Sequence, residues 1–134
     1  MAGLGVCAID DIALSVLACV IAVQPERQRV IIDAGWMALS RDRGTANHVV
    51  DQGYGLVCDL DGYPLGDLVV VETNQEHGIV ASRSGAEIDF NALSVGTLVR
   101  VLPSHACATA AMHAHYHVVD GMMTDEVWYR DDGW

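Results

Sequence analysis

A chain of 134 residues is long enough for one domain with a buried core and leaves little room for a second. Hydrophobic residues make up 51% of it and charged residues only 19%, so part of the apolar surface is expected to belong to an interface. Seven basic residues against eighteen acidic ones give a formal net charge of −11, and such a surface repels phosphate backbones and anionic lipid. We therefore expect neither nucleic acid nor a membrane as a partner.

No segment is expected to cross a membrane or to direct secretion. The longest apolar stretch, Ile12 to Val23, is shorter than the roughly 20 residues that a membrane helix needs. Asp10 and Asp11 precede it, where a signal peptide would carry basic residues. The cysteines, Cys7, Cys19, Cys58 and Cys107, include no CxxC pair. This cysteine usage favours a cytoplasmic protein with reduced thiols.

The first half of the chain predicts a buried hairpin followed by a long loop. The apolar run Ile12 to Val23, the turn Gln24 to Arg27 and the run Arg29 to Ile32 indicate two paired strands, although a helix remains an alternative for the first arm. Arg41 to Gly53 is polar and has no periodic apolar residues, which favours an exposed loop. Such a loop could also lie against a partner domain.

Turn dipeptides divide the second half of the chain into short strands. Asp61-Gly62, Ser84-Gly85 and Asp120-Gly121 are the turn signals. The expected strands are Leu56 to Cys58, Leu68 to Val71, Thr97 to Val101 and Tyr116 to Val119. Only Cys107 to His113 has helix formers in succession, enough for two turns at most. The predicted fold class is mainly β, a compact barrel or sandwich-like domain with one or two short helices.

A cluster of histidines raises the question of metal binding. Four of the six histidines lie between positions 105 and 117. Imidazole and thiolate both suit zinc, and side chains two residues apart in an extended segment point the same way, so His105 and Cys107 could share an ion. A catalytic zinc generally has three protein ligands and an open position, so water, substrate or another domain would have to complete this site.

A rival grouping consists of His113, His115 and His117, which on a strand would face one side and could form a three-histidine site. The same alternation with Ala114 and Tyr116 is typical of a half-exposed strand that binds no ion. We prefer the second interpretation for these three histidines.

Several segments resemble the D-serine dehydratase-like domain of fold-type III pyridoxal-phosphate (PLP) enzymes. They are Asp11 to Leu17, Ile32 to Ser40, Glu76 to Gly78, Gly96 to Cys107 and Trp128 to Trp134. The resemblance covers nearly the whole chain, so residues 1–134 are interpreted as one such domain. The family includes D-serine dehydratases, D-threo-3-hydroxyaspartate dehydratases and D-threonine aldolases, in which an alanine-racemase-like barrel precedes the domain. That barrel is absent here.

The resemblance implies site residues and cofactors. By position, His105 and Cys107 correspond to the metal ligands, and His-x-Cys is similar to the dehydratases, whereas the aldolases show His-x-Asp. Asp33, Glu76 and His77 also match family motifs and are expected either to have structural roles or to hold the metal ligands in position, rather than to be catalytic. Zinc is favoured by the thiolate, with manganese or magnesium as alternatives. Trp36 matches a family motif too and is expected in the core or at an interface.

The basic residues limit what the chain can do alone. All seven are arginine, so the chain has no lysine to hold pyridoxal phosphate as a Schiff base. The resemblance therefore implies a lyase domain that is inactive by itself and needs a PLP-binding barrel domain as partner, with Met1 as an internal methionine of a longer protein. A homo-oligomer, such as a dimer, is also expected. The alternative is a stand-alone module that binds a metal or a partner without turnover.

Overall fold

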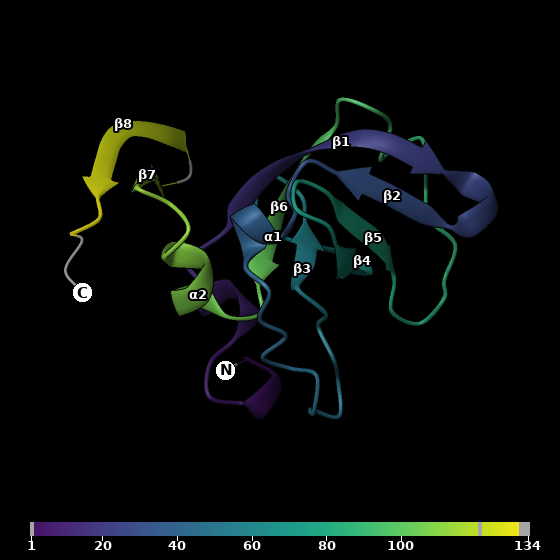
Figure 1. The fold of residues 1–134 in the computed structure, drawn as a ribbon, viewed down its shortest axis with the longest axis horizontal. Helices are drawn as coiled ribbons and strands as arrows, with labels where there is room; N and C mark the ends of the chain where they lie inside the picture. The colour runs from purple at the N-terminus through teal and green to yellow at the C-terminus, as the bar shows by residue number, and fades with distance from the viewer. Residues whose placement is uncertain (1, 121, 132–134) are drawn as a thin grey trace.

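The computed structural model describes residues 2–120 and 122–131, and within them the fold is mainly β, as the sequence predicts (Figure 1). Six antiparallel strands close a barrel in the order β1-β2-β5-β4-β3-β6. Their bounds are β1 Val16–Gln24, β2 Arg29–Ile32, β3 Gly55–Cys58, β4 Pro64–Thr73, β5 Gly78–Ser82 and β6 Leu98–Pro103. Closure leaves the barrel without a free edge, so every strand is paired on both sides.

Small β-branched side chains fill the barrel. Val20, Ile32, Val70 and Val101 are fully buried in its core. Such side chains suit the narrow interior of a small barrel, because they pack well on a pleated surface and lose little rotamer freedom there. A second cluster forms around Leu56 and Cys58, with Ile12 packed against it. The strand β3 is therefore buried on both faces, which explains its unbroken apolar sequence.

The first hairpin and the long loop agree with the sequence analysis. The strands β1 and β2 pair antiparallel around the 3₁₀ turn Pro25–Arg27, so the alternative of a helix for the first arm is wrong. The segment 41–53 lies outside any regular strand or helix and is largely exposed, as expected. Gly62 and Gly85 adopt left-handed φ angles of 91° and 81°, which confirms their places in turns. Gly121 lies outside the described residues.

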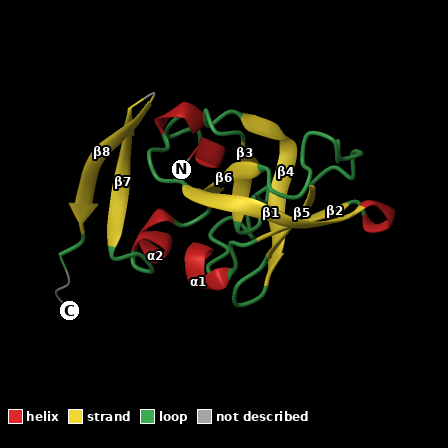
Figure 2. Cartoon of the chain, turned by 90° about the horizontal axis from the view of Figure 1, so that it is seen from above, coloured by secondary structure: helices red, strands yellow, loops and turns green. Residues whose placement is uncertain are grey.

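Two short helices and a second sheet complete the described part of the chain. They are α1 Trp36–Leu39, α2 Ala106–Ala110, β7 His115–Asp120 and β8 Met122–Tyr129, besides the 3₁₀ turns Ala2–Leu4 and Ile9–Asp11. The strands β7 and β8 form a separate two-stranded sheet that lies on the α2 side of the barrel, away from its wall (Figures 1 and 2). Within the described residues, no helix has the length and apolar character needed to cross a membrane.

Close backbone contacts position α1. The N–H groups of Trp36 and Met37 donate to the carbonyls of Asn74 and Gln75 at 2.9 and 3.2 Å. These bonds satisfy N–H groups that a helix start leaves unpaired. At Gly35 a Cβ atom would lie 2.3 Å from the Asn74 carbonyl oxygen, so only glycine fits there. The start of α1 is therefore fixed against the turn between β4 and β5.

The helix α2 packs on α1 through two side-chain bonds. The buried hydroxyl of Thr109 donates to the Leu39 carbonyl at 2.8 Å, and Nε2 of His113 donates to the Ala38 carbonyl at 3.0 Å. Both acceptors lie at the end of α1, where helix carbonyls have no partner within the helix. The position of α2 therefore depends on α1.

Candidate metal centre

His105 and Cys107 lie where β6 leads into α2. His105 has extended backbone angles, φ −136° and ψ 96°, and is the residue before the helix, while Cys107 lies in its first turn. The premise of our sequence argument, that both residues belong to one extended segment, is therefore wrong. Their side chains are not related by the two-residue alternation of a strand.

Asp42 contacts His105 across the fold. Its carboxylate oxygen Oδ2 is hydrogen-bonded to Nδ1 of His105, and each of the two side chains is 44% exposed. Asp42 is itself held at two backbone atoms. Its N–H donates to the Ser40 hydroxyl at 3.2 Å, and the Ser104 hydroxyl donates to its carbonyl at 3.1 Å. The start of the loop 41–53 is thus tied to the segment that carries His105.

The two candidate ligands offer chemically suitable donors. Cys107 is a free, exposed thiol. Among residues 2–120 and 122–131, neither its Sγ atom nor Nε2 of His105 takes part in a hydrogen bond. An imidazole nitrogen and a thiolate fit a zinc ion. In the same part of the chain, no group of three or more His, Cys, Asp or Glu residues is placed to hold a metal ion.

The site is open in this chain. Two cavities on the barrel have volumes of about 310 and 420 Å³, and neither is lined by His105 or Cys107. Ligand sites in enzymes are concave and bury most of a small ligand. Neither of these two cavities therefore brings a small ligand to His105 and Cys107.

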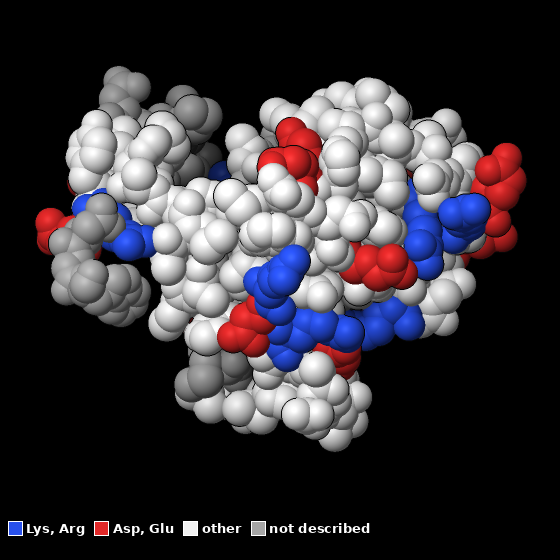
Figure 3. Space-filling view, viewed as in Figure 1, with Lys and Arg blue, Asp and Glu red and all other residues white. Residues whose placement is uncertain are grey.

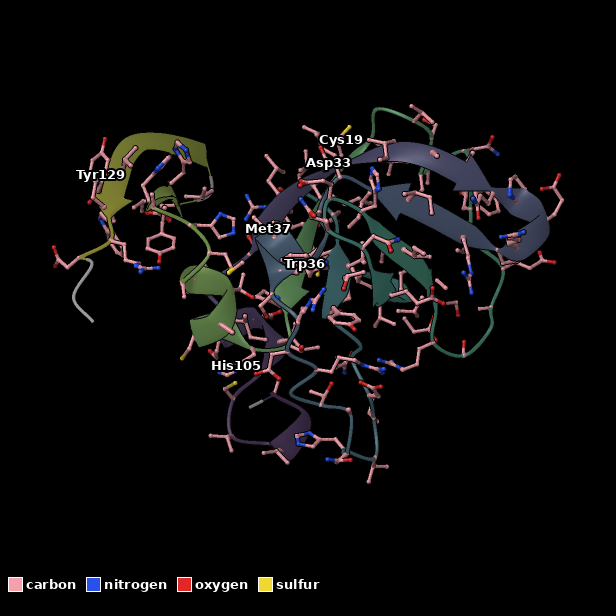
Figure 4. All side chains as sticks on the ribbon, viewed as in Figure 1. Cys19, Asp33, Trp36, Met37, His105 and Tyr129 are labelled. Carbon is pink, nitrogen blue, oxygen red and sulfur yellow. The ribbon has the colours of Figure 1, made fainter. Side chains whose placement is uncertain are left out.

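The residues expected to support the ligands lie elsewhere in the described structure. Oδ1 of Asp33 accepts the N–H of Cys19 at 2.7 Å, and the N–H of Asp33 donates to the Cys19 carbonyl at 3.1 Å. Asp33 therefore joins β2 to β1, next to the irregular register of this pair. Figure 4 shows Asp33 and His105 on opposite sides of α1.

Glu76 and His77 are exposed in the turn between β4 and β5. The His77 carbonyl accepts the N–H of Asn74 at 2.8 Å, and Oε1 of Glu76 accepts from Gln75 at 3.2 Å. These contacts shape the turn that receives α1. No hydrogen bond of the described residues joins Glu76, His77 or Asp33 to His105 or Cys107. Asp42, which the sequence analysis did not single out, makes that contact instead.

The rival histidines do not form one group. The rings of His115 and His117 meet edge to face with their centroids 5.2 Å apart on β7, and that of His115 lies 6.0 Å from Tyr129. His113 precedes the strand, and its Nε2 is bonded to α1. Among the described residues, these three histidines therefore do not form a group that could hold a metal ion. This agrees with a half-exposed strand that binds no ion.

Charge and apolar surface are unevenly distributed around α1. The guanidinium of Arg41 lies 4.4 Å from the ring centroid of half-buried Trp36, a cation–π contact, and Met37 beside it is 45% exposed. Figure 3 shows mainly uncharged side chains between the β7–β8 hairpin and the charged groups near the centre of this face.

The loop 41–53 has its own electrostatic anchor in Asp51. Burial alone would raise the pKa of Asp51. Hydrogen bonds from the Gly53 N–H and the Thr45 hydroxyl, together with the Arg43 guanidinium, outweigh burial and hold the pKa below its usual value. These contacts order the loop whose first residues reach His105.

The amino-acid sequence matches one protein family and several of its members. The model of the family described as "Putative serine dehydratase domain" matches residues 13–119. The D-threo-3-hydroxyaspartate dehydratase of Delftia sp. is 48% identical over 136 residues, which cover all of this chain and 36% of that protein. The D-serine dehydratase of Dictyostelium discoideum is 36% identical over 87% of this chain and 29% of its own length. The chain thus spans about a third of these relatives.

A shorter relative also matches. An uncharacterized protein of Mycobacterium bovis is 32% identical over 109 residues, which cover 79% of this chain and 72% of that protein. The share of this relative that our chain covers is about twice the share of the Delftia dehydratase that it covers.

Solved structures give the same relationship. The Delftia enzyme superimposes with a TM-score of 0.91 at 48% identity, covering all of this chain and 36% of the other. Two further structures of a D-threo-3-hydroxyaspartate dehydratase, 47% and 46% identical to this chain, carry an alanine in place of a histidine and, two positions later, in place of a cysteine, the latter in the metal-free form. A D-threonine aldolase from Filomicrobium marinum shares the fold, with a TM-score of 0.59 at 21% identity. The chain belongs to the serine dehydratase domain family.

Proposed function

We propose that this chain is the metal-binding C-terminal domain of a PLP-dependent lyase that acts on D-3-hydroxy amino acids, and that it is inactive alone. Two observations support incompleteness: the chain spans about a third of the dehydratases it matches, and it has no lysine for the cofactor. Its partner is a PLP-binding barrel domain, and the whole enzyme is a homo-oligomer of the cytoplasm, in keeping with four free cysteines.

The observation that carries the metal assignment is the pair of open donors at the start of α2. His105 and Cys107 have the same two-residue spacing as the histidine and the cysteine replaced in the two variant structures of a D-threo-3-hydroxyaspartate dehydratase. In our proposal, Nε2 of His105 and Sγ of Cys107 hold the ion. Zinc is favoured by the thiolate, and manganese or magnesium are alternatives.

The chemistry follows from the substrate. Hydroxide is a poor leaving group, and a divalent metal held by His105 and Cys107 would supply Lewis-acid stabilisation of the β-hydroxyl oxygen. His105 and Cys107 orient that centre, and their exposure leaves room for a substrate supplied by the barrel. Dehydration of D-serine or D-threo-3-hydroxyaspartate is favoured over aldol cleavage of D-threonine, because the relatives of highest identity reported above are dehydratases.

Calorimetric titration of zinc tests the metal centre. Cys107→Ser, which replaces a thiolate by a neutral hydroxyl, and His105→Ala are each expected to weaken binding by tenfold or more. His115→Ala is the matched control, because it removes an exposed histidine from β7 and should leave the affinity unchanged. Unchanged affinity for Cys107→Ser together with a loss for His115→Ala would move the site to the β7 histidines.

Reconstitution tests the enzyme assignment. The isolated chain with added pyridoxal phosphate should not deaminate D-serine or D-threo-3-hydroxyaspartate. Mixing it with a separately expressed barrel domain and zinc should produce the keto acid and ammonia, and Cys107→Ser in the mixture should remove most of this activity. Turnover by the isolated chain would contradict the proposal.

A second candidate is a stand-alone module that binds a metal or a partner without turnover. The relative from Mycobacterium bovis favours it, because this chain covers most of that protein rather than a third. The two proposals differ in one outcome. A stand-alone module would bind zinc through His105 and Cys107 and yet give no activity with any barrel domain of the family.

A further inference from the structure

We propose that Asp42 is a positioning residue for His105, which fixes the tautomer and the ring orientation of the imidazole so that Nε2 is presented as the metal donor. The inference rests on the proposed metal centre for its purpose. Its structural content, the state of the His105 ring, can be measured without any metal.

The hydrogen bond determines the tautomer. An ionised carboxylate can only accept, so the contact between Oδ2 of Asp42 and Nδ1 of His105 requires the proton to lie on Nδ1. In the neutral ring, the lone pair then lies on Nε2, which takes part in no hydrogen bond of the described residues. Metal-binding histidines generally donate their other ring N–H to a carboxylate or a carbonyl, and this bond also raises the basicity of the ligand.

Asp42 is well placed for this role because its backbone is anchored on both sides of the contact. The Ser40 hydroxyl accepts its N–H, and the Ser104 hydroxyl donates to its carbonyl. Ser104 directly precedes His105, so the bond partner and the ring belong to one hydrogen-bonded unit. The Asp42 carboxylate is therefore already in position before an ion binds.

The rest of the loop adds rigidity beyond Asp42. Oδ1 of Asp51 accepts from the Thr45 hydroxyl at 3.0 Å and from the Gly53 N–H at 2.9 Å, and its Oδ2 pairs with Arg43. Arg43 also lies over the ring of Tyr54, with 5.7 Å between the guanidinium carbon and the centroid. The first residues of the loop are thus held by its own closing contacts. The orientation of His105 is a property of this chain and needs no barrel domain.

Nitrogen-15 NMR of the histidine rings is the decisive measurement. In metal-free protein at alkaline pH, His105, assigned with the variant His105→Ala, should show a protonated Nδ1 and an unprotonated Nε2. Asp42→Ala should convert it to a mixture or to the Nε2–H form that exposed imidazoles prefer. Asp42→Asn keeps an acceptor oxygen and should retain the wild-type tautomer. Asp61→Ala is the control, an exposed turn aspartate whose side chain makes no bond to a histidine.

Zinc titration supplies the second readout. Loss of such an outer partner typically costs about 10- to 100-fold in metal affinity, which is the weakening expected for Asp42→Ala, with a smaller loss for Asp42→Asn and none for Asp61→Ala. Circular dichroism should show that all three variants retain the β fold. A fall in zinc affinity can then be attributed to the orientation and tautomer of the His105 ring.

Three results would overturn the proposal. They are an Nε2–H tautomer in the wild-type protein, an unchanged tautomer and affinity in Asp42→Ala, and loss of the Nδ1–H signal on adding zinc, which would mean that the ion binds Nδ1 of His105 rather than Nε2. Failure of the wild-type chain to bind zinc through His105 would instead contradict the proposed metal centre, while the tautomer measurement would still decide what Asp42 does.

Discussion

At the scale of single residues, two thiols in contrasting environments provide a test of the metal centre. Cys58 is fully buried, and burial, with Asp59 nearby, raises its pKa to about 11, whereas Cys107 is exposed. Only thiolates react readily with alkylating reagents. We expect iodoacetamide to modify Cys107 in the folded protein and to spare Cys58, and we expect zinc to protect Cys107. Mass spectrometry of digests measures both rates. Protection that persists in His105→Ala would argue against a shared ion.

Asp51 gives a residue-scale prediction about pH. Its pKa in the folded protein is lowered from the usual 3.8, so its contacts stabilise the fold above that pH and are lost as the pH falls through the lower, folded value. Asp51→Asn should therefore reduce the free energy of unfolding at neutral pH, and the difference from wild type should shrink below about pH 4. Urea unfolding of both proteins across this range measures it. A difference independent of pH would mean that the carboxylate charge contributes nothing.

At the scale of elements, local patterns predicted the barrel strands but not the geometry of the site. The β1–β2 hairpin was predictable because apolar, β-branched runs flank a proline turn. The helix α2 begins one residue after His105 without a side-chain cap, and Pro103 to His105 resembles a continuing strand. Helices this short depend on tertiary packing rather than on propensity. The contact of Asp42 with His105 spans 63 positions, so no local signal points to it.

The dependence of α2 on α1 leads to a prediction for Thr109. Thr109→Val keeps the shape of the side chain but leaves the Leu39 carbonyl without its buried donor. Such a loss costs about 1–3 kcal/mol. We expect a corresponding fall in the free energy of unfolding and weaker zinc binding, because α2 carries Cys107. Ala108→Ser, at a half-buried neighbouring position, is the control. Full stability of Thr109→Val would show that the contact between the helices is dispensable.

At the scale of the whole molecule, several large hydrophobic side chains are exposed on the elements beside the candidate site. Trp128 and Tyr129 on β8 are 60% and 79% exposed, and Met37 on α1 is exposed as well. An isolated two-stranded sheet is marginally stable in water, so β7 and β8 gain most from covering by another surface. Trp36, expected in the core or at an interface, is half-buried beneath Arg41, so Met37 is the more accessible of the two.

The last prediction follows from this surface. We expect the isolated chain to self-associate at increasing concentration and to bind a separately expressed barrel domain in preference, because both events cover the β7–β8 hairpin and α1. Hydrogen exchange should slow in these elements on binding and stay unchanged in the barrel core. Replacing both Trp128 and Tyr129 with alanine should weaken binding by about tenfold or more, since exposed aromatic side chains often dominate interfaces. Tyr63→Ala, which removes an equally exposed ring before β4, is the matched control. A chain that stays monomeric at high concentration and binds no barrel domain would show that this apolar face has no partner.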